Sequence, residues 1–134
     1  MRLLLDTNVL VAAFLSRGVC HELVEHCALN HEVVASEHVL EELRRVLVRK
    51  GRVPPQRAEG ALALLRARFT LVPSPPLEAP ASRDADDDLV LSAARQGGCA
   101  CVVTGDAHLL ELGSWNGIDI LTPTGFWRYE ADRR

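Results

Sequence analysis

The sequence has little lysine and few aromatic residues. Lys50 is the only lysine among 15 basic residues, and aromatic side chains make up 4% of the chain. The formal net charge is −3, whereas proteins that bind nucleic acid by charge alone are usually basic. So few aromatic residues do not indicate a base-stacking surface, and we expect Phe126 and Trp127 to pack in a core or an interface.

Long hydrophobic runs are also lacking. No apolar run approaches the roughly 20 residues that a membrane-spanning helix requires. Asp6 and Asn8 interrupt the apolar N-terminal stretch, which is unlike a secretory signal. The sequence therefore predicts a cytoplasmic protein without a membrane anchor, and the length of 134 residues predicts a single domain over 1–134.

No familiar zinc-binding spacing is present among the four cysteines, which are Cys20, Cys27, Cys99 and Cys101. The histidines at His21, His26 and His31 could supply further ligands. The cysteines nevertheless lie in hydrophobic surroundings and form no CxxC pair, so we expect buried, reduced thiols.

Short apolar segments alternate with helical patterns along the chain. Strands are predicted over 2–5, 32–36, 70–72, 99–106 and 118–121. Helices are predicted over 8–16, 20–29, 36–50, 58–69, 83–98 and 107–113, with a capped turn over 122–129. This alternation predicts βαβ units, which form an α/β sandwich of three layers around a parallel sheet of four to five strands. The proline-rich segment 73–82 is expected to be an extended loop inside the domain.

Two aspartates follow predicted strands directly. Asp6 ends the first apolar segment, and Asp106 follows the strand that ends near Thr104. Each could simply cap the helix that comes next. Because the carboxyl ends of parallel strands meet at one edge of a sheet, we also expect both carboxylates at the crevice where ligands bind.

The helix predicted over 36–50 carries two adjacent glutamates. Glu41 has charged and polar neighbours one turn away and belongs to the solvated face. Glu42 instead neighbours Val39 and Val46, at the edge of the apolar stripe. A carboxylate turned toward the interior requires a partner, which could be a buried arginine or a metal ion.

An acidic cluster, Asp-Ala-Asp-Asp-Asp over 84–88, opens the helix predicted for 83–98. Negative charge is favourable at a helix N-terminus, which could explain the whole cluster. Asp87 nevertheless shares a helix face with Val90 and Leu91, whereas Asp88 lies beside Ser92. Periodicity therefore favours Asp87 as the inward-facing carboxylate and keeps Asp88 as the alternative.

Four carboxylates are thus expected at one end of the sheet: Asp6, Glu42, Asp87 and Asp106. Like charges gathered within a few ångströms repel one another and raise one another's pKa values. A divalent cation is the simplest compensation, and an all-oxygen ligand set suits Mg²⁺ or Mn²⁺. Such a site can activate water and stabilise the charge that develops on a phosphodiester, which predicts metal-dependent phosphate chemistry.

Four segments together resemble PIN-domain proteins, in particular the VapC-like toxins of type II toxin–antitoxin systems. They read LLLDTNVLVAAF, SEHVLEELRRVL, DADDDLVLSAA and VVTGDAHLLEL, and they occur in the order typical of that family. The resemblance implies a Rossmann-like fold and an endoribonuclease that depends on one or two Mg²⁺ or Mn²⁺ ions. It also implies an RNA substrate, a protein antitoxin and a homodimer.

The resemblance matches the acidic positions residue by residue. Asp6 corresponds to the aspartate after the first strand, Glu42 to the helix glutamate and Asp106 to the aspartate of the Thr-Gly-Asp turn. Asp87 is the best match to the third acidic position, with Asp88 as the alternative. The supporting polar positions of the pocket, which could hydrogen-bond a ligand carboxylate, correspond to Asn8 and Thr104.

Two alternatives remain. A catalytically silent PIN-like interaction module would have no reason to keep four mutually repelling carboxylates. A phosphatase or receiver-type phosphoryl-transfer domain needs a lysine near the phosphate, but Lys50 stands at the end of a surface helix. The phosphatase motif also has a second aspartate where this chain has Asn8.

Overall fold

A six-stranded, mostly parallel sheet forms the centre of the molecule in the computed structural model, which describes residues 1–133. Its strands occur in the order β3 (Thr70–Leu71), β2 (Glu32–Ala35), β1 (Arg2–Leu5), β4 (Cys101–Val103), β6 (Ile118–Leu121) and β5 (Ser114–Trp115). All neighbouring pairs are parallel except β5 and β6. The predicted number of four to five strands was therefore too low by β5.

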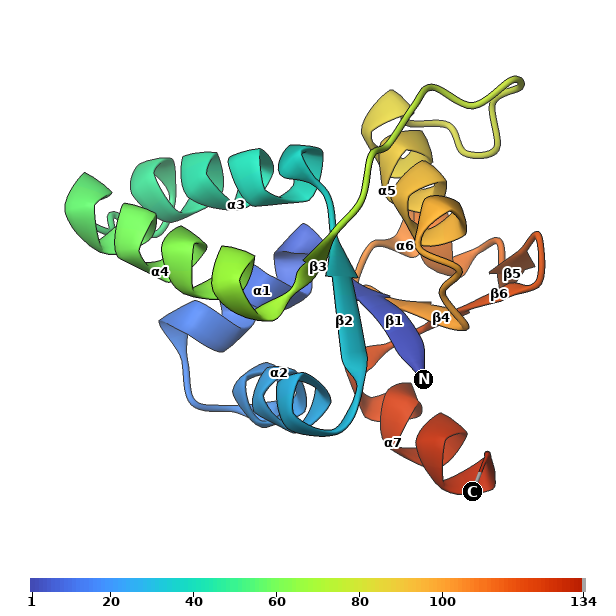
Figure 1. Ribbon diagram of the computed structural model, residues 1–134, viewed down its shortest axis with the longest axis horizontal. Helices are drawn as coiled ribbons and strands as arrows, with labels where there is room; N and C mark the ends of the chain where they lie inside the picture. The colour runs from blue at the N-terminus through green and yellow to red at the C-terminus, as the bar shows by residue number, and fades with distance from the viewer. Residues whose placement is uncertain (134) are drawn as a thin grey trace.

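Helices cover both faces of the sheet (Figure 1). One side carries α1 (Thr7–Leu15), α2 (Val19–Asn30), α3 (Glu37–Arg49) and α4 (Pro55–Arg68). The other side carries α5 (Ala85–Gln96) and α6 (Ala107–Leu110), while α7 (Pro123–Asp132) packs against α2. The predicted α/β sandwich of three layers is confirmed. Within residues 1–133, none of these helices has the length and apolar character needed to cross a membrane.

The central strands are apolar because helices cover them from both sides. Leu3, Leu4 and Leu5 of β1 are at most 1% exposed, and Val102 and Val103 of β4 are fully buried. Continuous apolar runs of this kind are typical of parallel strands. The close fit of α5 on the sheet depends on Gly97, because a Cβ atom there would lie 2.7 Å from Val34 Cγ1.

Two elements near the C-terminus differ from the sequence-based expectation. The edge strand β5 is joined to β6 by a two-residue turn in which Asn116 and Gly117 have φ values of 50° and 77°. Asn-Gly favours this left-handed hairpin turn, a signal that the prediction overlooked. The turn expected over 122–129 is instead the start of helix α7, in which the Thr122 side chain accepts from Gly125 N and Pro123 occupies the first turn.

The thiols are free, and Cys27, Cys99 and Cys101 are buried while Cys20 is partly exposed. Burial raises the pKa of each of the three buried thiols to about 12, so they stay protonated near neutrality. The three histidines considered with the thiols each contact a carboxylate, and His21 Nε2 lies 3.1 Å from Glu25 Oε1. The Nε2 atoms of His26 and His31 lie 2.6 and 2.5 Å from Glu130 Oε2 and attach α7 to the end of α2.

The direction of the crossovers changes between β1 and β4. From β1 the chain moves outward through β2 to β3, then returns through α5 to β4 on the other side of β1. Sheets of this kind have a crevice at that point, outside the carboxyl ends of the two strands. Asp6 directly follows β1, and Thr104 directly follows β4.

Candidate active site

An acidic pocket of about 360 Å³ lies at this switch point. Its lining includes six carboxylates and one cation, which are Asp6, Glu42, Asp84, Asp86, Asp87, Asp106 and Lys50. The four predicted acidic residues therefore line the same pocket, although they belong to four separate parts of the chain. We call this pocket the acidic site.

Asp6 combines two tasks at the end of β1. Its Oδ1 atom accepts from Thr7 N at 2.8 Å, which caps α1. Its Oδ2 atom accepts from the Thr104 hydroxyl at 2.8 Å and from Asn8 Nδ2 at 3.2 Å. The side chain is only 5% exposed, so burial raises the pKa of Asp6 although these three hydrogen bonds oppose the change. The helix cap and the place in the acidic site are thus compatible.

Asn8 and Thr104 connect the ends of β1 and β4. Asn8 Oδ1 accepts from Gly105 N at 2.8 Å, while its Nδ2 atom lies 3.4 Å from Thr104 Oγ1. Thr104 Oγ1 in turn accepts from Asp106 N at 2.9 Å. The two contacts of Asn8 join the turn after β1 to the turn after β4, and the Asp106 bond orders the second turn, so together they hold Asp6 and Asp106 in one pocket.

Glu42 projects from α3 toward the acidic site, whereas its neighbour Glu41 does not. Glu41 is exposed and pairs with Arg44 along the helix surface. The Glu42 side chain is 32% exposed, and its Oε2 atom lies 3.6 Å from His38 Nε2. Burial, followed by the negative charge of Asp6, raises the pKa of Glu42. The structure thus gives the two adjacent glutamates separate surroundings.

Asp87 and Asp88 also point to different places. Asp87 is 6% exposed and lines the acidic site. Asp88 Oδ1 accepts from the backbone N atoms of Ala81 and Ser82, at 3.2 and 2.8 Å, and so fastens the preceding loop to α5. Of the two candidates for the third acidic position, only Asp87 is among the residues that line the pocket.

Among the carboxylates of the acidic site, Asp87 has the largest shift in pKa. Its pKa rises from 3.8 to about 7, because the carboxyl is buried, is hydrogen-bonded to Asp106 and lies near the charges of Asp106, Asp84 and Asp6. Lys50 is the only cationic side chain among the residues that line the pocket. Oxygen ligands with excess negative charge are the donor set that Mg²⁺ and Mn²⁺ require, so the residues present fit such an ion.

Several residues of the acidic site were not foreseen from the sequence. Lys50 lies eight positions after Glu42, about two helical turns along α3, and it is exposed at the end of that helix as expected, but it also lines the pocket. Asp84 and Asp86 line the mouth of the pocket, and His38 Nε2 lies 3.5 Å from Asp86 Oδ1. The helical spacing from Glu42 could have indicated Lys50, whereas the position of His38 depends on how α3 packs near α5.

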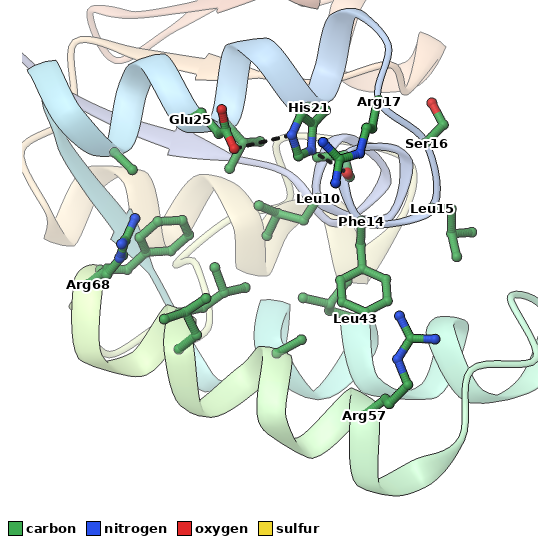
Figure 2. Close-up of a pocket in the computed structure, with 17 residues that line it drawn as sticks. Leu10, Phe14, Leu15, Ser16, Arg17, His21, Glu25, Leu43, Arg57 and Arg68 are labelled. Atoms are coloured by element: carbon green, nitrogen blue, oxygen red, sulfur yellow. Dashed lines mark hydrogen bonds and ion pairs between the residues drawn. The ribbon is translucent and has the colours of Figure 1, made fainter.

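A second, larger hollow of about 510 Å³ lies away from the acidic site, between α1, α2 and α4 (Figure 2). We call it the apolar groove. Its lining includes the exposed apolar residues Phe14, Leu15 and Leu64. It also includes three arginines and a single carboxylate, which are Arg17, Arg57, Arg68 and Glu25. Exposed apolar side chains gathered in this way are typical of a binding surface.

Comparison with solved structures finds the same fold in toxin–antitoxin proteins. The chain is similar to VapBC2 from Rickettsia felis bound to a promoter DNA fragment (TM-score 0.63, 16% identity, covering 91% of this chain and 98% of the other). It is also similar to VapBC-1 from nontypeable Haemophilus influenzae (TM-score 0.62, 17% identity, coverage 92% and 99%). A third match is Mycobacterium tuberculosis VapC20, a sarcin–ricin loop cleaving toxin (TM-score 0.59, 16% identity, coverage 87% and 98%).

At these identities the structural matches establish the fold alone. No curated protein sequence matches this chain. A family model described as PIN domain, however, matches residues 2–108, which include all four predicted acidic residues. The expected relationship is thereby confirmed: the chain belongs to the PIN domain family.

Proposed function

We propose that this protein is a divalent-metal-dependent endoribonuclease and the toxin of a toxin–antitoxin pair. The observation that carries the proposal is the acidic site, where Asp6, Glu42, Asp87 and Asp106 meet at the switch point of the sheet. The PIN-domain match and the similarity of fold to VapC20, which is described as a sarcin–ricin loop cleaving toxin, support the choice of RNA as substrate.

In this proposal the four carboxylates hold one or two Mg²⁺ or Mn²⁺ ions. When bound, such an ion would supply a Lewis acid for the phosphodiester and lower the pKa of a water molecule. Hydrogen bonds from Thr7, Asn8 and Thr104 fix the orientation of the Asp6 carboxylate. Asp87 is favoured over Asp88 as the third acidic ligand, because Asp88 is engaged with the loop at Ala81 and Ser82.

Lys50 takes part in substrate binding in this proposal. A phosphate group of RNA must approach a pocket lined by six carboxylates, and Lys50 is the cation on its wall. An ammonium there can contact a phosphate adjacent to the scissile bond. A phosphatase remains disfavoured, because Asn8 donates a hydrogen bond to Asp6 where that chemistry needs a second acidic residue.

The apolar groove is proposed as the binding site for a segment of the antitoxin. Phe14, Leu15 and Leu64 are 37%, 48% and 56% exposed there. Arg57 Cζ lies 5.9 Å from the centre of the Phe14 ring, and Figure 2 shows this pair at the end of the groove away from Arg68. Apolar anchors beside an excess of arginine fit an amphipathic helix with acidic flanks. The same toxin assignment predicts a homodimer in the cytoplasm.

Two matched pairs of variants test the nuclease proposal. E42Q and D87N change carboxylates that line the acidic site, while E41Q and D88N change their immediate neighbours, which face elsewhere. We expect E42Q and D87N to lower Mn²⁺-dependent RNA cleavage by about 100-fold or more, as loss of a charged transition-state contact typically does. E41Q and D88N should stay within about threefold of wild type, a difference of less than 1 kcal/mol.

Equal losses within a pair would contradict the assignment of the site. Circular dichroism on all four variants excludes unfolding as the cause of a loss. If folded wild-type protein, freed of any partner, cleaves no RNA with either Mg²⁺ or Mn²⁺, the silent interaction module becomes the better explanation.

A further inference from the structure

His108 lies beside two carboxylates of the acidic site, Asp87 and Asp106, and follows Asp106 by two residues. Its backbone N donates to Asp106 Oδ1 at 2.8 Å, which places the residue at the start of α6. Its imidazole is exposed, and within residues 1–133 it forms no hydrogen bond or ion pair. The ring is therefore available to a ligand in a way that the hydrogen-bonded rings of His26 and His31 are not.

The imidazole of His108 lies where it could share a cation with Asp87 and Asp106. One ligand atom from each of Asp87, Asp106 and His108 lies within 4.8 Å of the other two. Ligands at about 2.1–2.2 Å from an octahedral ion are about 3 Å apart in adjacent positions and about 4.3 Å apart across the ion. Small side-chain rotations would bring the three atoms to those separations, because His108 is exposed and Asp106 is partly exposed.

We propose that His108 is a metal ligand and that it makes the acidic site select a transition-metal ion such as Mn²⁺ over Mg²⁺. An imidazole nitrogen is a softer ligand than a carboxylate oxygen, and Mg²⁺ binds it poorly compared with first-row transition metals. Carboxylates alone would accept either ion. The inference rests on the proposed function, since it concerns the ion that the same carboxylates hold.

Among residues 1–133, His38 is the other histidine close to carboxylates of the acidic site. Asp6 is enclosed by Thr7, Asn8 and Thr104, which supply donors and leave no imidazole beside it. His38 lies beside Glu42 and Asp86, with its Nε2 atom 3.6 and 3.5 Å from their carboxylate oxygens, and it is not part of the cluster of Asp87, Asp106 and His108. A nitrogen bound to an ion shared by Asp87 and Asp106 is therefore assigned to His108, and His38 serves as the comparison.

Mn²⁺ provides a direct readout without RNA, because it is paramagnetic. Pulsed electron paramagnetic resonance of the wild-type protein loaded with one equivalent of Mn²⁺ should show the coupling of a directly bound imidazole nitrogen. The coupling should vanish in H108A and persist in H38A. Bound Mn²⁺ without a nitrogen coupling, or a coupling unchanged in H108A, would overturn the proposal.

Binding affinities provide the second readout. In calorimetric titrations at pH 8, H108A should bind Mn²⁺ about tenfold more weakly, while Mg²⁺ binding changes less than about threefold. H108D replaces the nitrogen by oxygen and should narrow the ratio of Mn²⁺ to Mg²⁺ affinity. Equal weakening of both ions in H108A would contradict a nitrogen ligand. That result would leave the nuclease proposal intact, whereas absence of any metal binding by wild type would defeat both.

Discussion

The hydroxyl of Thr104 donates a hydrogen bond of 2.8 Å to Asp6 Oδ2 and thereby joins the carboxyl end of β4 to that of β1. Both side chains are buried, at 0% and 5% exposure. Thr104 Oγ1 also accepts from Asp106 N, so one hydroxyl positions the acidic residues that follow both central strands. Thr104 is a positioning residue in this account, because it acts on Asp6 and Asp106.

Replacing Thr104 with valine tests this positioning. T104V keeps the shape of the side chain but removes the hydrogen bonds of the hydroxyl, which should raise the pKa of Asp6 further and weaken its binding of a cation. We expect kcat/KM for RNA to fall about tenfold, equivalent to roughly 1.4 kcal/mol. T104S restores the hydroxyl and should recover most of the loss. A T104S variant as impaired as T104V would instead point to the methyl group and to packing.

The raised pKa of Asp87 predicts that the stability of the metal-free protein depends on pH between about 4 and 7. Its pKa in the folded state is about 7, against an ordinary 3.8, so the folded state binds the proton more tightly than the unfolded chain. The free energy of unfolding should therefore fall as pH rises from about 4 to 7. In D87N this contribution is absent, so the variant should be more stable than wild type above pH 7.

Urea unfolding of both proteins in a chelator at pH 4 and pH 8 measures this difference. The gap between D87N and wild type should be larger at pH 8. Added Mn²⁺ should restore the stability of wild type at pH 8, because bound metal stabilises the folded state. A gap that is the same at both pH values would show that the Asp87 carboxylate carries no such penalty.

Local sequence patterns predict part of the acidic site, and tertiary packing decides the rest. Asp6, Glu42 and Asp106 could be selected because strand ends and helical periodicity decide which side chains face the sheet edge. The helical spacing from Glu42 could have indicated Lys50, whereas His38 comes close to Asp86 only through the packing of α3 near α5, which no local pattern specifies. The helix α7 was missed for a different reason, since its docking depends on Glu130 meeting two histidines about 100 positions earlier.

Lys50 should affect RNA binding more than chemistry. K50A removes the cation on the wall of the acidic site, so KM should rise about fivefold at low salt while kcat changes little. The slope of log affinity against log salt should become shallower by about 0.7, the value for one phosphate contact on a single strand. K50R retains the charge and should behave nearly as wild type. An unchanged salt slope in K50A would exclude a phosphate contact.

The apolar groove should govern binding of the antitoxin. L64D places a charge among the apolar residues that line the groove, whereas L29D alters an apolar residue on α2 that is 80% exposed and lies outside it. Against a protein encoded beside this gene, L64D should weaken binding by about 100-fold, near 3 kcal/mol, and L29D by less than threefold. Equal effects of the two substitutions would place the partner elsewhere on the molecule.

Restoring metal to stripped protein tests the central claim most directly. Wild type and D6N are treated with a chelator, mixed with RNA, and then given Mn²⁺ in excess, while circular dichroism confirms that D6N keeps its fold. We predict no cleavage before Mn²⁺ is added, cleavage by wild type afterwards, and a rate at least about 100-fold lower for D6N. Cleavage in the presence of the chelator, or equal rates for D6N and wild type, would contradict the account.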